Sequence, residues 1–310
     1  MILNCGEALI DMVAQTLPDG HSAYVPHPGG AVLNTAVALG RLGVTSSFLA
    51  GLSEDLFAAD LKTHMQDSNV TFELCPHFDA PTTLAFVQLV DSQARYAFFD
   101  ENTALRNLSV SDLPAIPQDT SALFFGGISL AYGTCADAYE HLMVTSSTDH
   151  VTMIDPNIRP GFIRDEVSYR ARLDRMLAVA DIVKLSDEDL SWLEGEGPMD
   201  AAAKAILARG AKLVFITQGS KGATAFHANF QVFCPATPVD LTDSDTIGAG
   251  DTFNAGVLAA LFEAGALDKS ILTDLPEATA EAAVTLGMAS AAVTVSRKGA
   301  NPPWRSELSL

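Results

Sequence analysis

The chain has 310 residues, 48% of them hydrophobic, which is enough for one large α/β domain with a small appendage. Its 18 Lys and Arg stand against 38 Asp and Glu, and the formal net charge of −20 would repel both nucleic acid and an anionic membrane. The four cysteines lack paired spacing and no apolar run is long enough to span a membrane, so we expect a soluble, cytoplasmic protein.

Two segments in the first third of the chain lack helical periodicity. Val13–Val25 contains a turn sequence, Pro18-Asp19-Gly20, between two short extended pieces. Asp91-Ser92-Gln93 separates two strand-like runs in the manner of a hairpin. No helix accompanies either segment. We therefore expect a small β-sheet, built from about residues 12–27 and 82–100, beside the main sheet.

The second half of the chain alternates short apolar runs with longer segments. The runs are Ala122–Phe125, Val151–Ile154, Ile182–Leu185 and Leu213–Thr217. Each is followed by a segment long enough for a helix, which predicts βαβ units. We expect an α/β fold with a Rossmann-like, mainly parallel sheet that helices cover on both faces, in a single domain over residues 1–310.

A glycine-rich motif near the C-terminus carries the clearest chemical signal. It runs from Asp245 to Phe253 and precedes a segment of helical periodicity. Gly248, Ala249 and Gly250 can present backbone N–H groups at a helix start, which forms an anion site. Asp251 follows directly. It either complements the helix dipole or takes a proton from a hydroxyl that attacks phosphorus.

A second glycine motif lies near the N-terminus. Gly29 and Gly30 precede another segment of helical periodicity, and Asn34 lies one turn inside it. Asn is a mediocre helix former, so an interior Asn favours a polar role. Taken alone, the motif is equally compatible with a glycine turn followed by an exposed side chain.

Together, the two motifs resemble those of the ribokinase-like (phosphofructokinase B-type) carbohydrate kinases, and among these most closely those of fructokinases. The family carries Gly-Gly-x-x-x-Asn near its N-terminus and Asp-Thr-x-Gly-Ala-Gly-Asp near its C-terminus, here Gly29–Asn34 and Asp245–Asp251. The similarity extends over almost the whole chain. It implies a ribokinase-like fold, a β-sheet lid over the sugar, and transfer of phosphate from ATP to a sugar hydroxyl with Mg²⁺.

The resemblance also implies residue roles. Asp251 would be the catalytic base, with Gly248, Ala249 and Gly250 cradling the phosphate. The implied substrate-binding residues are Asp11, Gly29, Gly30, Asn34, Asn157 and Arg159, with Arg95, Tyr96 and Phe98 from the small sheet as further candidates. The implied nucleotide-binding residues are Lys184, Ser186, Thr217, Gly219, Gly222 and Gly299, and the implied metal-binding residues are Asp189 and Asp245.

The sugar itself is a narrower question. A phosphorylated sugar would need two or three nearby cations, and only Arg95 and Arg159 lie close to the sugar motifs. We therefore favour a neutral sugar and conversion of D-fructose to fructose 6-phosphate. The alternatives within this fold are 2-keto-3-deoxygluconate kinase and ribokinase. A catalytically silent sugar-binding regulator belongs to another class.

Two further questions stay open at this stage. Ile247 and Pro303 offer no polar side chain where one could help bind a monovalent cation, so the need for K⁺ is undecided. Exposed strand edges in a lid often pair across a dimer, so a homodimer through the small sheet is one expectation. A Rossmann dehydrogenase is disfavoured because no Gly-x-Gly-x-x-Gly follows the first strand.

Overall fold

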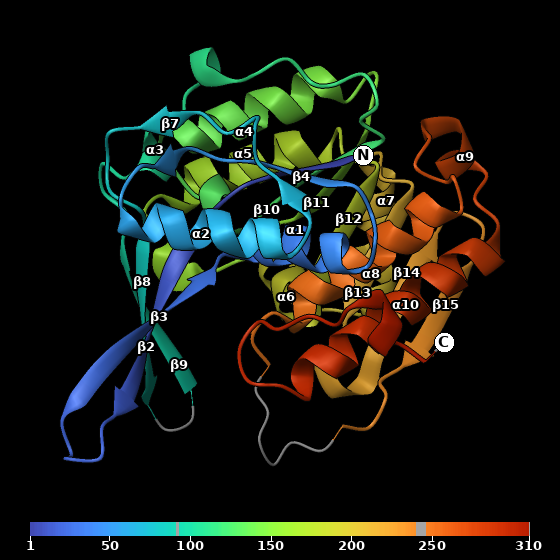
Figure 1. The fold of residues 1–310 in the computed structure, drawn as a ribbon. Helices are drawn as coiled ribbons and strands as arrows, with labels where there is room; N and C mark the ends of the chain where they lie inside the picture. Colours follow the sequence, from blue (N-terminus) through green and yellow to red (C-terminus); the bar gives the residue numbers. More distant parts are fainter. Residues whose placement is uncertain (91–92, 240–245, 310) are drawn as a thin grey trace.

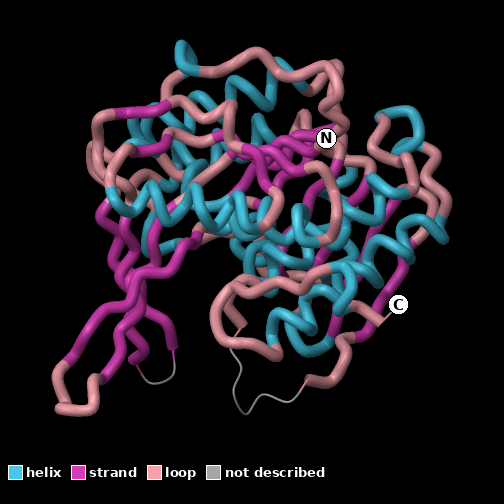
Figure 2. The backbone as a smooth tube through the Cα atoms, in the orientation of Figure 1, coloured by secondary structure: helices cyan, strands magenta, loops and turns pink. Residues whose placement is uncertain are grey.

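The computed structural model describes residues 1–90, 93–239 and 246–309, and gives no side chains for residues 87–96. The chain forms a main body with a small separate sheet projecting from it (Figures 1 and 2). Arg95 and Tyr96 are thus placed by their backbone only, and Asp245 lies outside the described residues.

The main body is organised around a sheet that has nine strands among the described residues. Their spatial order is β15 (Gln231–Pro235), β14 (Gly222–His227), β13 (Leu213–Thr217), β12 (Ile182–Ser186), β11 (Val151–Asp155), β10 (Ala122–Gly126), β1 (Ile2–Cys5), β4 (Ser46–Leu49) and β6 (Val70–Thr71). The seven strands from β13 to β6 are parallel, whereas β14 and β15 are antiparallel. The mainly parallel α/β fold predicted from the sequence is confirmed.

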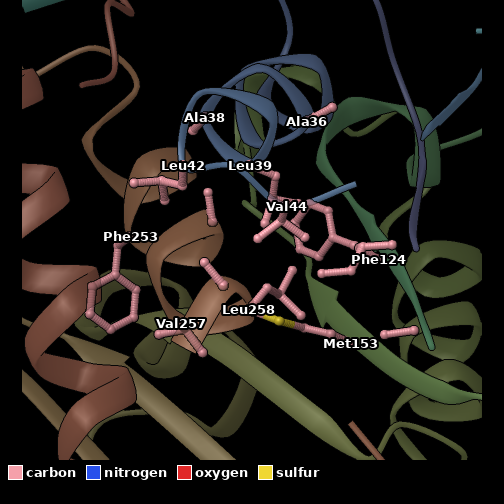
Figure 3. Close-up of a cluster of buried hydrophobic side chains, with 14 of the residues drawn as sticks. Ala36, Ala38, Leu39, Leu42, Val44, Phe124, Met153, Phe253, Val257 and Leu258 are labelled. Atoms are coloured by element: carbon pink, nitrogen blue, oxygen red, sulfur yellow. The ribbon is translucent and has the colours of Figure 1, made fainter. Parts of the chain in front are cut away.

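Both faces of this sheet are covered by helices. One face packs against α1 (Ala31–Arg41), α2 (Leu56–Asp67), α8 (Ala249–Glu263), α9 (Lys269–Thr273) and α10 (Glu277–Val295), and the other against α4 (Gly133–Ser146), α5 (Glu166–Leu177), α6 (Asp187–Glu194) and α7 (Met199–Ala208). Ile2 and Leu3 enter opposite cores because successive strand residues point to opposite faces. Figure 3 shows side chains of α1 and α8 meeting Phe124 and Met153 of the sheet.

One predicted βα unit is wrong. No helix follows Leu213–Thr217; a 3₁₀ turn and the antiparallel hairpin of β14 and β15 follow instead. Gly222 opens β14 at φ +129°, and a Cβ there would lie 2.2 Å from the carbonyl oxygen of Cys234. The glycine therefore permits close strand pairing, which the length of the segment alone did not reveal.

The small sheet has the order β3 (Ser22–Gly29), β2 (Leu9–Thr16), β8 (Leu84–Val90) and β9 (Gln93–Phe99). Two antiparallel hairpins, β2 with β3 and β8 with β9, join through the parallel pair of β2 and β8. The strands coincide with the two segments predicted to form it. The N-terminal segment contributes to both sheets, since β1 belongs to the main sheet, β2 belongs to the small sheet, and the chain crosses between them at residues 6–8.

The remaining elements are short or peripheral. They include the two-stranded pair β5 (Leu52–Ser53) and β7 (His77–Phe78) and the short helix α3 (Ala104–Asn107).

Helix α10 is the one helix in the described part of the chain that is long and apolar enough to span a membrane, with a mean hydropathy of 1.3. Half of it is buried against the protein and it packs along α8, so core packing explains its composition.

Gly256 lies at a close approach of α8 to α10. A Cβ at Gly256 would lie 2.6 Å from Cα of Gly287 and 2.8 Å from the carbonyl oxygen of Leu286. Because both neighbours are backbone, Gly256→Ala should lower the free energy of unfolding by about 1–3 kcal/mol, measured by denaturant titration. Gly161→Ala, which meets nothing within 4 Å, is the control. Equal stability of the two variants would contradict this packing.

Candidate active site

The carboxyl ends of the parallel strands open into a cavity of about 490 Å³. Its lining includes Asp11, Gly30 and Asn34 at one end and Ser186, Thr217 and Gly219 at the other. Asp251 and Gly248 also line it. The two glycine motifs, more than 200 residues apart in sequence, therefore meet at one cavity.

Asp251 occupies the first turn of α8 and is only 6% exposed. Its Oδ2 accepts a hydrogen bond from Asn34 Nδ2 at 2.9 Å, and its Oδ1 accepts one from Asn157 Nδ2 at 3.4 Å. Thr35 Oγ1 donates to the Asp251 carbonyl oxygen at 3.2 Å. The carboxylate is thereby fixed in orientation while it still lines the cavity.

Burial raises the pKa of Asp251 to about 6. The Asn34 hydrogen bond opposes this rise, the nearby Asp155 carboxylate reinforces it, and Lys184 and Arg159 oppose it. A carboxylate with a pKa near 6 remains ionised at neutral pH and is a stronger base than an Asp in water. These properties suit a general base.

Asn34 bonds to a different partner from the one that its motif implied. The sequence assigned it to a sugar hydroxyl, but its Nδ2 donates to Asp251. It also lines the cavity, so its remaining polar capacity faces the predicted sugar end. Asn34 and Thr35 together attach α1 to the start of α8.

The N-terminus of α8 offers fewer free backbone amides for an anion than the motif predicted. Gly248 caps the helix at φ +76°, a left-handed conformation that suits glycine. Ala249 donates its N–H to the Thr246 carbonyl oxygen at 3.3 Å, and it is absent from the cavity lining. The N–H groups of Gly250 and Asp251 precede the intrahelical bonding that begins at Thr252, so these two amides are the better phosphate donors.

Lys184 brings a buried cation to the same helix end. Its Nζ donates to Asp155 Oδ2 at 2.9 Å, and a Cβ on Gly250 would lie 3.1 Å from that nitrogen. Burial would lower the pKa of Lys184, but Asp155, Asp189 and Asp251 outweigh it and raise the pKa. Lys184 therefore stays protonated beside the predicted phosphate position.

Asp155 and Asn254 are site residues to which the sequence analysis gave no role. Asn254 Nδ2 donates to Asp155 Oδ2 at 2.7 Å, and both side chains are buried. Asp155 begins the segment that supplies Asn157 and Arg159, and Asn254 lies three residues after Asp251, on the same helix face. Their spacing from the motif residues in the sequence could have indicated both side chains. The groups to which they bond are determined by the fold.

Asp11 lies on β2 of the small sheet, at the cavity. Burial, with a further contribution from Asp251, raises its pKa to about 7. A Cβ on Gly29 would lie 2.2 Å from Asp11 Oδ2, so Gly29 makes room for this carboxylate and is itself absent from the lining. Gly30 does line the cavity and caps α1 at φ +111°.

Asn157, Arg159 and Phe98 all line the cavity, as predicted. Asn157 adopts φ +47°, and its N–H donates to Asp155 Oδ1 at 3.1 Å. Arg159 is exposed, and its Nη1 donates to the carbonyl oxygen of Ile158 at 3.1 Å. The predictions for the side chains of Arg95 and Tyr96 lie outside the described residues.

At the predicted nucleotide end, Lys184, Ser186, Thr217 and Gly219 line the cavity, but Gly222 and Gly299 do not. Gly222 serves the strand pairing described above, which explains this glycine without a nucleotide, and its nucleotide role stays a prediction. Asp189 lines the cavity and also completes the capping box of α6 with Ser186. Its Oδ1 accepts the Ile158 N–H at 2.9 Å, and its Oδ2 the Ser186 N–H at 3.3 Å.

Glu7 is a buried cavity residue that the sequence analysis did not identify. Its Oε1 accepts the Ala31 N–H at 2.9 Å, and its Oε2 accepts the Ser129 N–H at 3.3 Å. It thereby supplies the α1 cap that Gly30, lacking a side chain, cannot provide. Burial raises the pKa of Glu7 to about 7, despite opposing hydrogen bonds.

Comparison with known proteins agrees with this arrangement. The family described as pfkB family carbohydrate kinase matches residues 2–307. The chain belongs to the pfkB family of carbohydrate kinases. The resemblance stated from the two glycine motifs is therefore confirmed.

Individual relatives of this pfkB family member are named fructokinases. One from Rhizobium leguminosarum bv. trifolii is 46% identical over 89% of this chain and 84% of its own. The ATP-bound structure of a fructokinase from Xylella fastidiosa has a TM-score of 0.86 at 27% identity, covering 96% and 93% of the two chains.

A fructokinase from Vibrio cholerae O395 has a fructose-, ADP- and calcium-bound structure, with a TM-score of 0.83 at 28% identity over 96% and 94% of the chains. A double mutant of it was solved with fructose, ADP and potassium, with a TM-score of 0.84 at 27% identity over 96% and 93%. These neighbours bear out the ribokinase-like fold.

The pKa of Asp251 leads to a kinetic prediction. A general base must be ionised, so with Asp251 in that role kcat/KM should fall as the pH drops through about 7 to 6, where Asp11 and Asp251 become protonated. Asn34→Ala removes the bond that lowers the pKa of Asp251, so its acid limb should move to higher pH. Asn157→Ala, which removes the longer bond, is the comparison and should shift the limb less. A limb that Asn34→Ala leaves in place would contradict the assignment.

The pKa of Asp11 leads to a stability prediction. Because the folded-state pKa, about 7, lies above the ordinary 3.8, the protein loses stability as the pH rises between these values. Asp11→Asn removes this penalty. Its free energy of unfolding should exceed that of the wild type by an amount that grows by about 1–3 kcal/mol from pH 5 to pH 8. A difference independent of pH, measured by denaturant titration, would contradict it.

Proposed function

We propose that this chain transfers the γ-phosphoryl group of ATP to D-fructose and forms fructose 6-phosphate. The observation that carries the proposal is the position of Asp251. Its carboxylate lines the cavity at the start of α8, where a helix N-terminus and a buried lysine can hold phosphate. The fructokinases among its relatives, one of them 46% identical, support the choice of reaction.

In the proposed reaction, the sugar binds among Asp11, Gly30 and Asn34 with one hydroxyl near Asp251. Asn34 and Asn157 orient the carboxylate, which accepts the hydroxyl proton as the oxygen attacks the γ-phosphorus. The amides of Gly250 and Asp251, with Lys184, stabilise the charge on the phosphoryl oxygens. Positioning provides most of the acceleration, because phosphoryl transfer has a loose transition state.

A magnesium ion would neutralise the phosphate charge in this reaction. The acidic residues at the α6 N-terminus fit such an ion, because magnesium is usually held by one or two carboxylates together with phosphates and water. Asp187, Glu188 and Asp189 all line the cavity there. Both carboxylate oxygens of Asp189 already accept hydrogen bonds from backbone N–H groups, whereas the Glu188 side chain is exposed. Glu188 is therefore a second candidate ligand for magnesium beside Asp189.

The charges around the cavity favour a neutral sugar over a sugar acid. Its lining contains the carboxylates Glu7, Asp11, Asp187, Glu188, Asp189 and Asp251. Among the described side chains, the cations that line it are Lys184, paired with Asp155, and Arg159. A substrate carboxylate at the Asp11 end would face like charges, which opposes 2-keto-3-deoxygluconate and is compatible with fructose or ribose.

We extend the proposal to the lid, the assembly and a monovalent cation. The small sheet acts as the lid, since Asp11 and Phe98 reach the cavity from it. A cytoplasmic homodimer paired through this sheet is the assembly we favour. The potassium-bound Vibrio structure supports a monovalent cation as a further ligand. Because the Ile247 side chain is apolar, this residue could bind such a cation only through its backbone.

Asp251→Asn tests the catalytic role against that of a silent regulator. The amide cannot accept the proton, so turnover should fall by about 10²–10⁴-fold. Sugar binding, measured calorimetrically, should stay within a few-fold of the wild type because the size of the side chain is preserved. Asp60→Asn, at an exposed position on α2 away from the cavity, is the control and should keep its turnover. Near-normal turnover in Asp251→Asn would contradict the base assignment.

A panel of fructose, ribose and 2-keto-3-deoxygluconate, assayed by ADP release, tests the substrate. We expect the highest kcat/KM for fructose. Preference for either other sugar would contradict the substrate while leaving the kinase assignment intact.

A further inference from the structure

The apolar wall at the sugar end of the cavity is separate from the two main cores. Leu9, Ala85 and Ile128 form a small buried cluster, against which Phe98 and Phe162 pack. Leu9 and Phe98 come from the small sheet, whereas Ile128 comes from the 3₁₀ turn Gly127–Leu130 of the main body. Because the wall is shared between two sheets, neither main core fixes its geometry.

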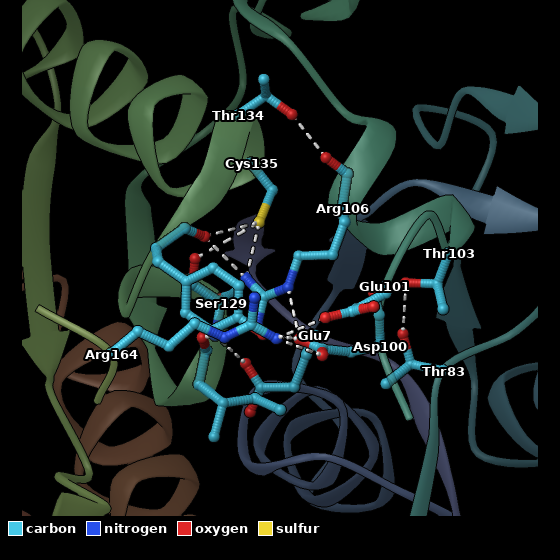
Figure 4. A network of polar contacts seen from close by, with 12 residues as sticks. Glu7, Thr83, Asp100, Glu101, Thr103, Arg106, Ser129, Thr134, Cys135 and Arg164 are labelled. Atoms are coloured by element: carbon cyan, nitrogen blue, oxygen red, sulfur yellow. Dashed lines mark hydrogen bonds and ion pairs between the residues drawn. The ribbon is translucent and has the colours of Figure 1, made fainter. Parts of the chain in front are cut away.

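Arg106 lies behind this wall and joins its two sides. Its Nε donates to Asp100 Oδ2 at 2.7 Å, and its Nη2 donates to the Ile128 carbonyl oxygen at 3.3 Å. Asp100 directly follows β9 and is two residues beyond Phe98. One guanidinium therefore connects the small-sheet side of the wall with the main-body side (Figure 4).

The surroundings hold Arg106 in a single orientation. Its Nη1 donates to the Tyr132 carbonyl oxygen at 2.9 Å and to Cys135 Sγ at 3.0 Å. Its guanidinium carbon lies 4.2 Å from the centre of the Tyr132 ring, and the Tyr132 hydroxyl donates to Asp100 Oδ2. Arg106 and Asp100 are 7% and 2% exposed. Planar, multidentate contacts of this kind require arginine and not merely a positive charge.

Aromatic contacts complete the connection to the cavity. Phe162 lies 5.3 Å from Tyr132 and 4.6 Å from Phe98, measured between ring centres. Thr83 and Thr103 also bond at 2.8 Å, which ties the two ends of the β8 and β9 hairpin together. The base of this hairpin is thus attached to the main body by both polar and aromatic contacts.

We propose that Arg106 is a positioning residue for the sugar, acting through Asp100 and Ile128 to fix the wall formed by Phe98 and Ile128. It does not line the cavity and takes no part in proton or phosphoryl transfer. The inference rests on the proposed sugar kinase function but not on fructose as the substrate. A substitution that weakens the contacts of Arg106 therefore weakens sugar binding and leaves ATP binding unchanged.

The test compares Arg106→Lys and Tyr132→Phe with the wild type, using whichever sugar of the panel the wild type phosphorylates best. We expect KM for the sugar to rise about threefold to tenfold. The KM for ATP and kcat at saturating sugar should stay within about twofold. Tyr132→Phe keeps the ring and removes only the bond to Asp100, so it retains the fold if the lysine variant is unstable.

Arg172→Lys is the matched control. Arg172 is also buried, pairs with Asp137 and Glu140, and donates to the Leu130 carbonyl oxygen of the same 3₁₀ turn, but it does not reach the small sheet. It should destabilise the protein without changing KM for the sugar. An unchanged sugar KM in both test variants, or an equal rise in the control, would overturn the proposal.

A double-mutant cycle with Phe98→Leu adds a readout that a purely structural role would not affect. If Arg106 acts through this wall, the effects of Arg106→Lys and Phe98→Leu on the sugar KM should be less than additive. Full additivity would overturn the proposal. A wild type that phosphorylates no sugar on the panel would instead contradict the proposed function, so the two failures are distinguishable.

Discussion

The hydrogen bond from Asn34 to Asp251 is the contact on which the site depends. It links two segments separated by 217 positions and joins the N-terminal turns of α1 and α8 inside the cavity. A buried carboxylate is costly unless it is hydrogen-bonded, and here the two asparagines reduce the cost without neutralising the charge. The result is a base that is oriented, ionised at neutral pH and still available to a hydroxyl.

The site also contains several buried acidic side chains. Glu7, Asp11 and Asp251 all have pKa values raised chiefly by burial, and all line one cavity. Their ionisation at neutral pH opposes folding, as is common where a site needs reactive groups. Burial of the large apolar cores on both faces of the main sheet stabilises the fold and offsets this destabilisation. Lys184 offsets part of the negative charge where phosphate would add more.

Much of this could be predicted from residue pattern. Parallel strands were visible as short apolar runs, and the glycine motifs marked two helix starts that do lie at the cavity. The hairpin of β14 and β15 was missed because a segment's length cannot separate a helix from two strands, and the strand-pairing role of Gly222 was missed with it. The partners of Asn34, Asp155 and Asn254 depend on tertiary packing, so sequence spacing indicated their presence but not their contacts.

The central claim is that Asp251 faces the reacting hydroxyl while the start of α8 faces the phosphate. A crystal structure with fructose and a non-hydrolysable ATP analogue measures this geometry directly. We expect one sugar hydroxyl within about 3 Å of the Asp251 carboxylate, and the γ-phosphate beside the amides of Gly250 and Asp251. A sugar bound with no hydroxyl near Asp251, or a phosphate held away from the α8 N-terminus, would contradict it.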